Sequence, residues 1–425
     1  MEQTSIPIST VLVVDPHPMA HVPYIHAATL ACLTSLGVRC ISLSVQCHEI
    51  RRELAGLIQR GELPGADDEL VQWASLADTA GVSWSDLQRA LTPWMQAQAD
   101  PAAALVWIGW LDYLVGASRK APRFPDWPWA WAGAFYLLPP SFHAGCRGSA
   151  SWSKERLLPF WRNCADTRCR GLAVLDEYWL ADARCSLLNR SFRAGSRKLF
   201  KFPDVASTHI NSSAGMALER AGRIRIGLLG QLSWRKGVVP FLEAACMAES
   251  CNPELEFLLA GELKIDQFGE ADRSFVLSTL QNPPRNLRHL SEPIADEGQF
   301  NALVSQCDVI HVAYNNFPGS SNLLTKAAAF EIPVIAYSGQ LIGRRVQDYR
   351  LGWIADEEGS SESYQDAILS LDYHKIRAAR SEGRWKEYIA LNNLERLRKT
   401  LWLIVASRDI RASPLRRLSL FSLIC

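Results

Sequence analysis

The sequence has few of the features that would tie it to a membrane, a nucleic acid or a disulfide framework. Lys plus Arg number 45 against 44 for Asp plus Glu, so the net charge of +1 gives no basis for nucleic-acid binding. The eleven cysteines include no CxxC pair, which favours a reducing compartment. Cys164 and Cys169 have no second pair beside them, so we expect no metal site.

Long apolar runs are also missing. No stretch reaches the ~18 apolar residues that a membrane-spanning helix needs, and no basic segment followed by an apolar run stands near the start. We therefore expect a cytoplasmic protein without a signal peptide. The stretch "ASPLRRLSLFSLIC" mixes arginine with apolar residues, and peripheral contact with the inner face of a membrane stays open beside packing back onto the protein.

What is present is an alternation of strand and helix patterns. "STVLVVD" is typical of a buried strand, "YIHAATLACLTSLG" of a helix that ends at Gly37, and "VRCISLSV" of a second strand. This βαβ opening predicts a parallel sheet with right-handed crossovers. Residues 50–100 read as helical, and "ALVWIGWLD", "GLAVLDEYWL" and "SRKLFKFPD" as further strands, whereas the Pro- and Trp-rich residues 121–140 read as a loop.

A second alternation follows a polar stretch at residues 205–222. Strand patterns at "RIRIGLLG", "LEFLLAG", "NLRHLSE", "DVIHVAY" and "PVIAYSG" are separated by helical segments. Since 425 residues exceed one ordinary core, we predict an α/β protein with two doubly wound, Rossmann-like domains facing a central cleft. The predicted boundaries are 1–208 (first domain), 209–221 (linker), 222–390 (second domain) and 391–425, a C-terminal helix and tail crossing back.

The stretch "GLLGQLSWRKGVVPFLEAA" is the first candidate site. Its strand ends at Gly230 and its helix begins near Val238. Arg235 and Lys236 stand just before the helix, and Gly237 separates them from its first residue. Backbone N–H groups at a helix N-terminus attract anions, and glycines allow a ligand to approach the backbone closely. The stretch alone fits either a phosphate site or an ordinary basic turn before a helix.

A second element of the same kind strengthens the phosphate interpretation. In "DVIHVAYNNFPGSSNLLTKAAAFEIPVIAYSG" a strand is followed by a loop, a helix and another strand. The loop ends in Pro318, Gly319, Ser320 and Ser321, and a serine there is a good N-cap. Two anion sites at the carboxyl ends of neighbouring strands could hold the two phosphates of a nucleotide diphosphate.

These elements together resemble a known family. From Ile224 to Ile354, "GQLSWRKGVVPFLEAA", "LLAGEL", "QCDVIHVAY", "AAAFEIPVIAYSG" and "LGWIAD" follow the order and spacing of the donor domain of group 1 (family 4-like) glycosyltransferases of the GT-B fold. The resemblance implies transfer of a sugar from a nucleotide-diphosphate sugar to a glycan, lipid-linked or other hydroxyl acceptor. It also implies that residues 222–390 bind the donor and residues 1–208 the acceptor. Retention of configuration and the lack of any cofactor or obligatory metal are also implied.

The match departs from the family pattern at four positions. The arginine of the family's G-R-L is Gln231, the glutamates of its E-x7-E pair fall on Pro318 and Lys326, and a glycine near the next strand is Glu331. By motif position, Lys236 would hold the diphosphate. Arg235 and Lys326 would replace the missing positive charge, while the remaining polar candidates, Ser320, Ser321 and Asn322, would bind sugar or ribose through neutral hydrogen bonds.

Two other classes stay open. Loss of the glutamate pair also fits a catalytically inactive GT-B-like module that binds a glycan or a partner protein. A nucleotide-sugar epimerase of the same architecture would need no acceptor. Neither GxGxxG nor GxxxxGK[ST] occurs, so dehydrogenases and P-loop enzymes are not expected.

The N-terminal half offers fewer candidates. His17 and His21 follow the first strand, and His21 aligns with the family's "GH" turn, so we name it as a catalytic candidate with Lys236. Asp112 and Asp176 end strand patterns and would either orient an acceptor or cap helices.

Fifteen tryptophans are the last unusual feature, and Trp127, Trp129 and Trp131 are close together. They suit core packing, a sugar platform or a membrane edge.

Overall fold

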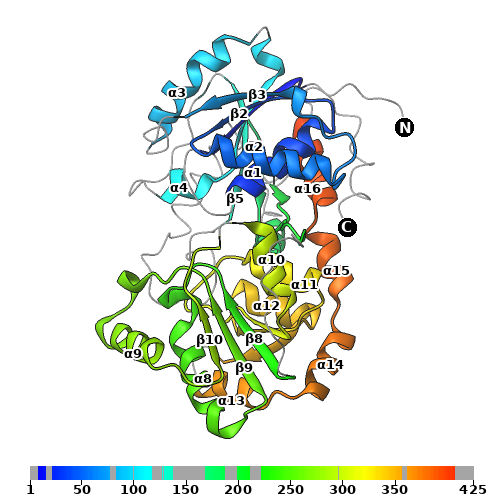
Figure 1. Cartoon of the computed structure of the whole chain (residues 1–425). Coiled ribbons are helices and arrows are strands. Elements are labelled where there is room, and N and C mark those ends of the chain that lie inside the picture. Colours follow the sequence, from blue (N-terminus) through cyan, green and yellow to red (C-terminus); the bar gives the residue numbers. More distant parts are fainter. Residues whose placement is uncertain are drawn as a thin grey trace. The chain divides into compact units, whose positions relative to one another are not determined.

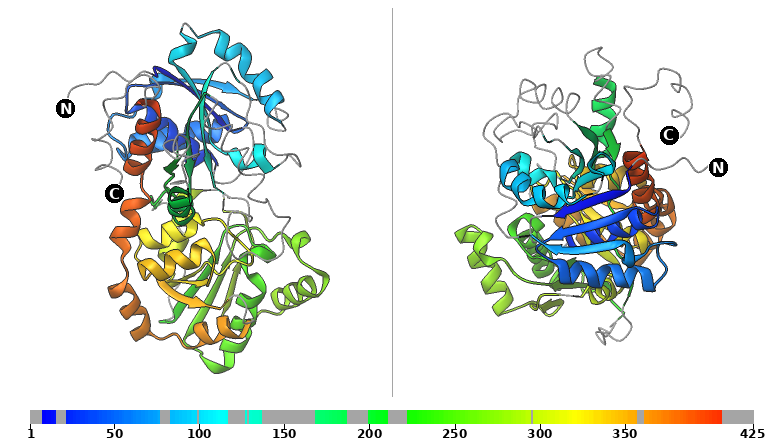
Figure 2. Two further views of the ribbon diagram at one scale, coloured as in Figure 1. Left: turned by 180° about the vertical axis from the view of Figure 1, so that it is seen from behind. Right: turned by 90° about the horizontal axis from the view of Figure 1, so that it is seen from above.

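The computed structural model describes residues 8–15, 22–76, 83–98, 100–116, 127, 129–136, 168–186, 199–210, 222–294, 296–356 and 361–406. The chain divides into two compact units (Figures 1 and 2). Unit 1 comprises Met1–Phe202 together with Leu394–Cys425, and unit 2 comprises Pro203–Asn393. Of the predicted linker 209–221, residues 211–221 lie outside the described residues.

Unit 1 is built on a parallel sheet. Its seven strands lie in the order β3-β2-β1-β4-β5-β6-β7. Their bounds are β1 Thr10–Asp15, β2 Arg39–Ser44, β3 Val71–Ser75, β4 Ala104–Ile108, β5 Ala130–Phe135, β6 Cys169–Val174 and β7 Leu199–Lys201. The central strands β1 and β4 are buried along their whole length and apolar except at Thr10 and Asp15, as strands of a doubly covered parallel sheet are.

Six helices complete the described part of unit 1: α1 Val22–Thr34, α2 Cys47–Gln59, α3 Trp84–Gln96, α4 Leu111–Gly116, α6 Glu177–Ser186 and α16 Leu394–Ala406. Helix α1 (VPYIHAATLACLT) is apolar around most of its circumference, and such a helix needs neighbours on several sides. It packs on β1, β2, α2 and α16 (Figure 1). Helix α16 is fixed there by Cys32, which donates to Leu394 O (3.5 Å), and by Thr400, which donates to Lys201 O (2.9 Å).

Two strands of this sheet depart from the sequence interpretation. Strand β3 lies within the residues predicted to be helical, so that prediction was wrong there. The strand is short, lies at the edge of the sheet and has mostly half-buried or exposed side chains, so its sequence lacks the apolar run of a buried strand. Strand β5 lies within the predicted loop. Glycine is required at position 133 of this strand, since a Cβ there would lie 2.7 Å from Ile108 O. Trp127, Trp129 and Trp131 are 2%, 8% and 0% exposed, so they pack in the core rather than line a surface.

Unit 2 repeats the plan with six parallel strands in the order β10-β9-β8-β11-β12-β13. The strands are β8 Ile224–Leu229, β9 Leu255–Ala260, β10 Leu287–Leu290, β11 Val309–His311, β12 Val334–Tyr337 and β13 Gly352–Ala355. The helices are α8 Val238–Cys251, α9 Glu270–Gln281, α10 Glu297–Ser305, α11 Asn322–Ala329, α12 Leu341–Tyr349, α13 Ser361–Leu369, α14 Tyr373–Glu382 and α15 Trp385–Leu391. The predicted α/β alternation is thereby confirmed in both units.

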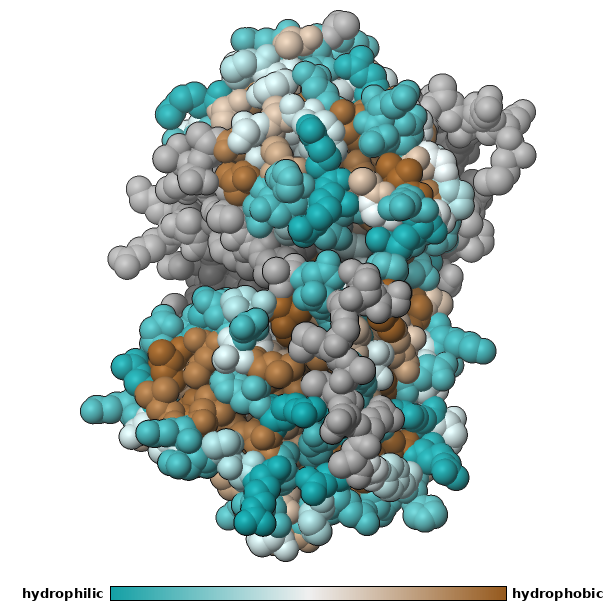
Figure 3. Space-filling view, in the orientation of Figure 1, coloured by the Kyte–Doolittle hydropathy of each residue, from teal (hydrophilic) through white to brown (hydrophobic). Residues whose placement is uncertain are grey.

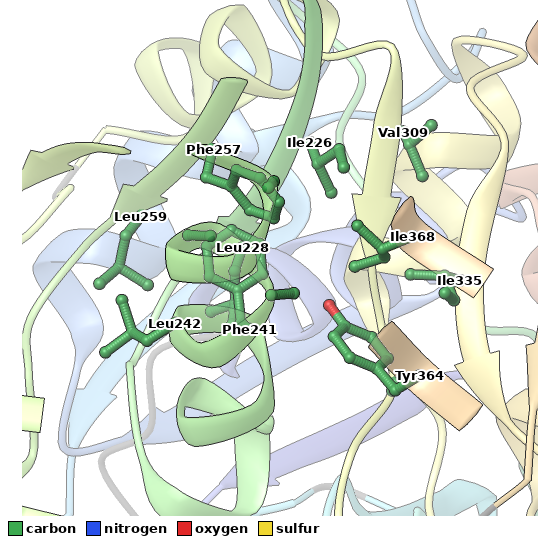
Figure 4. Close-up of a cluster of buried hydrophobic side chains, with 14 of the residues drawn as sticks. Ile226, Leu228, Phe241, Leu242, Phe257, Leu259, Val309, Ile335, Tyr364 and Ile368 are labelled. Carbon is green, nitrogen blue, oxygen red and sulfur yellow. The ribbon is translucent and has the colours of Figure 1, made fainter. Parts of the chain in front are cut away.

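Each face of the second sheet carries its own core. On one face, Ile226 and Leu228 of β8 meet Phe241 of α8, Phe257 of β9 and Tyr364 of α13 (Figure 4). The other face is filled from α10, α11 and α12, by residues that include Val304, Leu324 and Val346. At the edge, all four residues of β10 are half-buried, and apolar residues gather over this part of unit 2 in the space-filling view (Figure 3). In the described part of the chain, no helix has the length and apolar character to cross a bilayer.

The end of α11 explains why the family pattern has a glycine where this chain has Glu331. Ile332 N–H bonds to Ala327 O (2.9 Å) and Glu331 N–H to Ala328 O (3.1 Å), which is a Schellman motif. The motif requires a left-handed residue, and Glu331 adopts φ +53°. This position favours glycine, and a residue with a Cβ is strained there by about 1–2 kcal/mol.

We expect Glu331→Gly to raise the free energy of unfolding by about 0.5–1 kcal/mol, because relief of strain exceeds the extra chain entropy of glycine. Chemical denaturation measures the change. Glu331→Ala is the matched control, since alanine removes the carboxylate but keeps the Cβ. An equal gain from alanine would show that the carboxylate, and not the backbone, is the source of strain.

Candidate functional site

The turn between β8 and α8 depends on glycine at two points. Gly230 ends the strand with φ +102°, and Gly237 has φ +71° after a 3₁₀ turn at Trp234–Lys236. A Cβ on Gly237 would lie 2.6 Å from Ala313 O, and a Cβ on Gly261 would lie 2.0 Å from Gly230 O. The turn therefore packs backbone against backbone, and α8 begins directly after it.

Lys236 reaches from this turn to the next loop. Its half-buried side chain donates from Nζ to Tyr314 Oη (2.7 Å) and lies 4.2 Å from the centroid of the same ring. Arg235 is exposed, with its guanidinium 5.6 Å from the centroid of Phe317. Gln231, which stands where the family has arginine, is exposed as well.

A buried histidine holds the turn in place. His311 Nε2 lies 2.8 Å from Lys236 O, and since a carbonyl only accepts, Nε2 carries the proton. Nδ1 then accepts from the Tyr364 hydroxyl. Burial lowers the pKa of His311 to about 3, and the nearby Lys236 charge acts in the same direction, so the ring is neutral. Burial also raises the pKa of Tyr364, which keeps the phenol a donor.

The loop between β11 and α11 is tied to the same turn. Asn315 donates from its backbone N–H to Arg235 O (2.8 Å) and from Nδ2 to Trp234 O (2.9 Å). Ser321 is the N-cap of α11, but its hydroxyl makes no capping bond and instead lies 3.0 Å from Tyr314 Oη. Asn322 Oδ1, in the first turn of α11, is buried and has no hydrogen-bond partner among the described residues.

The start of the loop is held from the other side. Ser320 donates to the Asp204 carboxylate and accepts from Arg345, whose guanidinium is fully buried and pairs with Asp204 at 3.5 Å. Gly319 is buried beside it. The Ser320 hydroxyl thus takes part in a network inside unit 2, which differs from the sugar or ribose contact predicted for it.

Lys326 lies in a second internal network. Its side chain is 2% exposed, and Nζ donates to Glu297 Oε2 (2.6 Å), Asn301 Oδ1 (2.6 Å) and Ser207 O (2.8 Å). An ammonium has three donors, and these three bonds use them all. Lys326 therefore holds residues around Ser207 to α10 and α11, and we do not carry it forward as a phosphate ligand.

The structure brings together part of the predicted set. Gly230, Arg235, Lys236 and Ser321 lie on two loops that follow β8 and β11, which pair directly in the sheet, and Asn322 begins the helix after the second loop. The residues that sequence reasoning missed are His311, Tyr314, Asp204, Glu297 and Arg345. His311 and Tyr314 stand in the quoted strand "DVIHVAY", and a histidine inside an apolar strand is the signal that could have found the first of them.

The candidates of unit 1 have local roles where they are described. Asp112 accepts from Tyr136 N–H (2.9 Å), and Asp176 accepts from Trp179 N–H (2.9 Å) at the start of α6. His17 and His21 lie outside the described residues. Within the described ranges, no group of three or more His, Cys, Asp or Glu side chains is arranged to hold a metal ion.

Sequence comparison finds no family model that matches the chain and no curated protein that matches it. Solved structures do match over almost its whole length. Sucrose-phosphate synthase from Thermosynechococcus elongatus superposes with a TM-score of 0.60 at 15% identity, covering 92% of this chain and 96% of the other. HepE of Anabaena, solved with UDP and glucose, gives 0.59 at 12% identity over 92% and 98%.

A third neighbour, WaaG, a glycosyltransferase involved in lipopolysaccharide biosynthesis, gives a TM-score of 0.59 at 11% identity over 94% and 100%. These neighbours have the GT-B architecture, and the chain has the same fold. The α/β, GT-B fold class predicted from the sequence is therefore confirmed.

Proposed function

We propose that this protein is a glycosyltransferase that moves a sugar from a nucleotide-diphosphate sugar to a hydroxyl acceptor on a glycan or a lipid-linked molecule. The observation that carries the proposal is the placement of Lys236. Its ammonium lies between the glycine turn before α8 and the N-cap of α11. Support also comes from the GT-B neighbour HepE, which was solved with UDP-glucose and with UDP.

The chemistry follows from what this arrangement can stabilise. In the proposed reaction the bond between the anomeric carbon and the β-phosphate oxygen breaks. The acceptor oxygen bonds to the same face of that carbon, so configuration is retained, and the acceptor proton passes to the departing phosphate. Lys236 and the N-terminal N–H groups of α8 and α11 would stabilise the charge that develops on the diphosphate.

The donor-side contacts would differ from those of the family. The position of the second family glutamate is occupied by Lys326, whose donors are all used within unit 2. Asn322 Oδ1, buried and without a partner among the described residues, is the acceptor we assign to a ribose or sugar hydroxyl. We further propose that His21 acts on the acceptor side, that no metal or other cofactor takes part, and that the protein works in the cytoplasm.

One observation favours a second candidate function. Neither position of the glutamate pair carries a carboxylate, since Pro318 and Lys326 stand there. A GT-B module that binds a glycan or a partner protein without catalysis would have no need of that pair.

Calorimetric titration with UDP, GDP, ADP and TDP separates the two. We expect one diphosphate to bind, and Lys236→Ala to weaken it about 10- to 100-fold, since a hydrogen bond to a charged group contributes about 1.5–3 kcal/mol. Lys386→Ala, at an exposed position of α15, is the matched control and should bind normally. A folded wild-type protein that binds none of the four would overturn the transferase and favour the binding module.

A further inference from the structure

Three side chains from two loops form one continuous hydrogen-bonded chain. Lys236 Nζ lies 2.7 Å from Tyr314 Oη, and Tyr314 Oη lies 3.0 Å from Ser321 Oγ. Tyr314 and Ser321 are 5% and 6% exposed, so the chain is shielded from water except at the half-buried lysine. The chain runs from the turn before α8 to the N-cap of α11.

The direction of each hydrogen bond in this series follows from Lys236, its first residue. An ammonium has donors only, so Tyr314 Oη must accept from Lys236. The phenol proton is then free to point at Ser321 Oγ, the other neighbour of Tyr314 Oη. With that orientation Ser321 Oγ accepts, and no second hydrogen-bond partner of the Ser321 hydroxyl is present among the described residues. Each bond polarises the next, which strengthens Ser321 as a donor.

That remaining donor lies at a place built for an anion. Ser321 makes no side-chain capping bond, and Leu324 N–H bonds to Ser321 O (2.9 Å), so the N–H groups of Asn322 and Leu323 are the ones left to face a ligand. Lys236 uses one of its three donors on Tyr314. Two ammonium donors and the Ser321 hydroxyl, linked through Tyr314, therefore remain beside the N-terminus of α11.

We infer that Tyr314 is a positioning residue for the diphosphate and that Ser321 donates its hydroxyl to a phosphate oxygen. The inference rests on the proposed function and adds two groups to its phosphate site. The Tyr314 phenol suits the positioning of Lys236 better than a carboxylate would, because it orients the ammonium without neutralising its positive charge. The two hydroxyls would thus compensate for the family arginine that Gln231 replaces.

The test is titration of Tyr314→Phe and Ser321→Ala with the diphosphate that the wild type binds among UDP, GDP, ADP and TDP, and with inorganic pyrophosphate. Phenylalanine keeps the ring and its contact with the ammonium but removes the hydroxyl. We expect each substitution to weaken both probes about tenfold, the usual effect of one lost hydrogen bond. The double variant should lose much less than the hundredfold that independent sites would give, because both changes break one chain.

Two controls separate this role from general damage. Ser321→Thr keeps a hydroxyl at the N-cap and should bind within about twofold of the wild type. Tyr349→Phe removes a phenol from α12, on another part of unit 2, and should have no effect. Normal binding by Tyr314→Phe, with binding lost in Lys236→Ala, would overturn the inference and leave the proposed function standing. A wild type that binds no diphosphate and no pyrophosphate would overturn both.

Discussion

Lys326→Met should lower the free energy of unfolding by about 2–4 kcal/mol, because it leaves two buried acceptors, and a Glu297 carboxylate that is 27% exposed, without their donor. The lysine side chain is 2% exposed and bonds to Glu297, Asn301 and Ser207. Methionine fills a similar volume, so the loss comes from the carboxylate and the two acceptors left without a donor. Chemical denaturation followed by circular dichroism measures the change.

Two variants give this prediction its control. Lys264→Met removes a lysine whose pair with Glu262 is 28% and 48% exposed, and it should cost less than about 1 kcal/mol. Adding Glu297→Gln to Lys326→Met removes the carboxylate charge that has lost its partner. The double variant should therefore recover part of the lost free energy of unfolding. If Lys326→Met were as stable as Lys264→Met, the buried network would contribute nothing to unit 2.

Acid should destabilise the protein through His311. The ring is neutral in the folded state with a pKa of about 3, whereas an unfolded histidine titrates near its ordinary value of about 6.5. Below about pH 6.5 the unfolded state therefore binds one more proton than the folded state. Stability is fully present above that pH and falls by about 1.4 kcal/mol per pH unit until the folded pKa is reached.

Carboxylates titrate in part of the same range, so the comparison must be with a variant. Glutamine at position 311 keeps a donor for Lys236 O and an acceptor for the Tyr364 hydroxyl but does not titrate. Between pH 6.5 and 4.5, the free energy of unfolding should fall with decreasing pH in both proteins. The fall should be smaller in His311→Gln, by about 1.4 kcal/mol per pH unit, because the variant lacks the proton that unfolded His311 binds. His374→Gln, at an exposed position of α14, should follow the wild type, and identical slopes for all three would contradict the assignment.

The fold was largely predictable because its signals are local. Apolar runs such as "TVLVVD" and "IRIGLL" are buried strands wherever they occur, and the helices between them follow from spacing. Strands β3 and β5 escaped prediction because an edge strand with exposed side chains and a strand of small residues lack that signal. The sequence also showed where Lys236 and its glycines would lie, since strand, turn and helix are contiguous there.

The candidate site was less predictable because its other contacts are distant in sequence. Lys326 was interpreted as a phosphate ligand, yet its partners stand 29 and 119 residues away, at Glu297 and Ser207. Ser320 pairs with Asp204, 116 residues away. A charge in a motif position looks the same in sequence whether it faces a ligand or a buried carboxylate, and only tertiary packing decides between them.

The return of residues 394–406 to unit 1 affects the order in which the protein can fold on the ribosome. Unit 2 is one continuous segment, whereas unit 1 needs α16, which is synthesised after all of unit 2. Until then the apolar helix α1 lacks one of the neighbours that cover it. Domains usually fold in the order of synthesis, but unit 1 can be completed only after the whole of unit 2 has been synthesised.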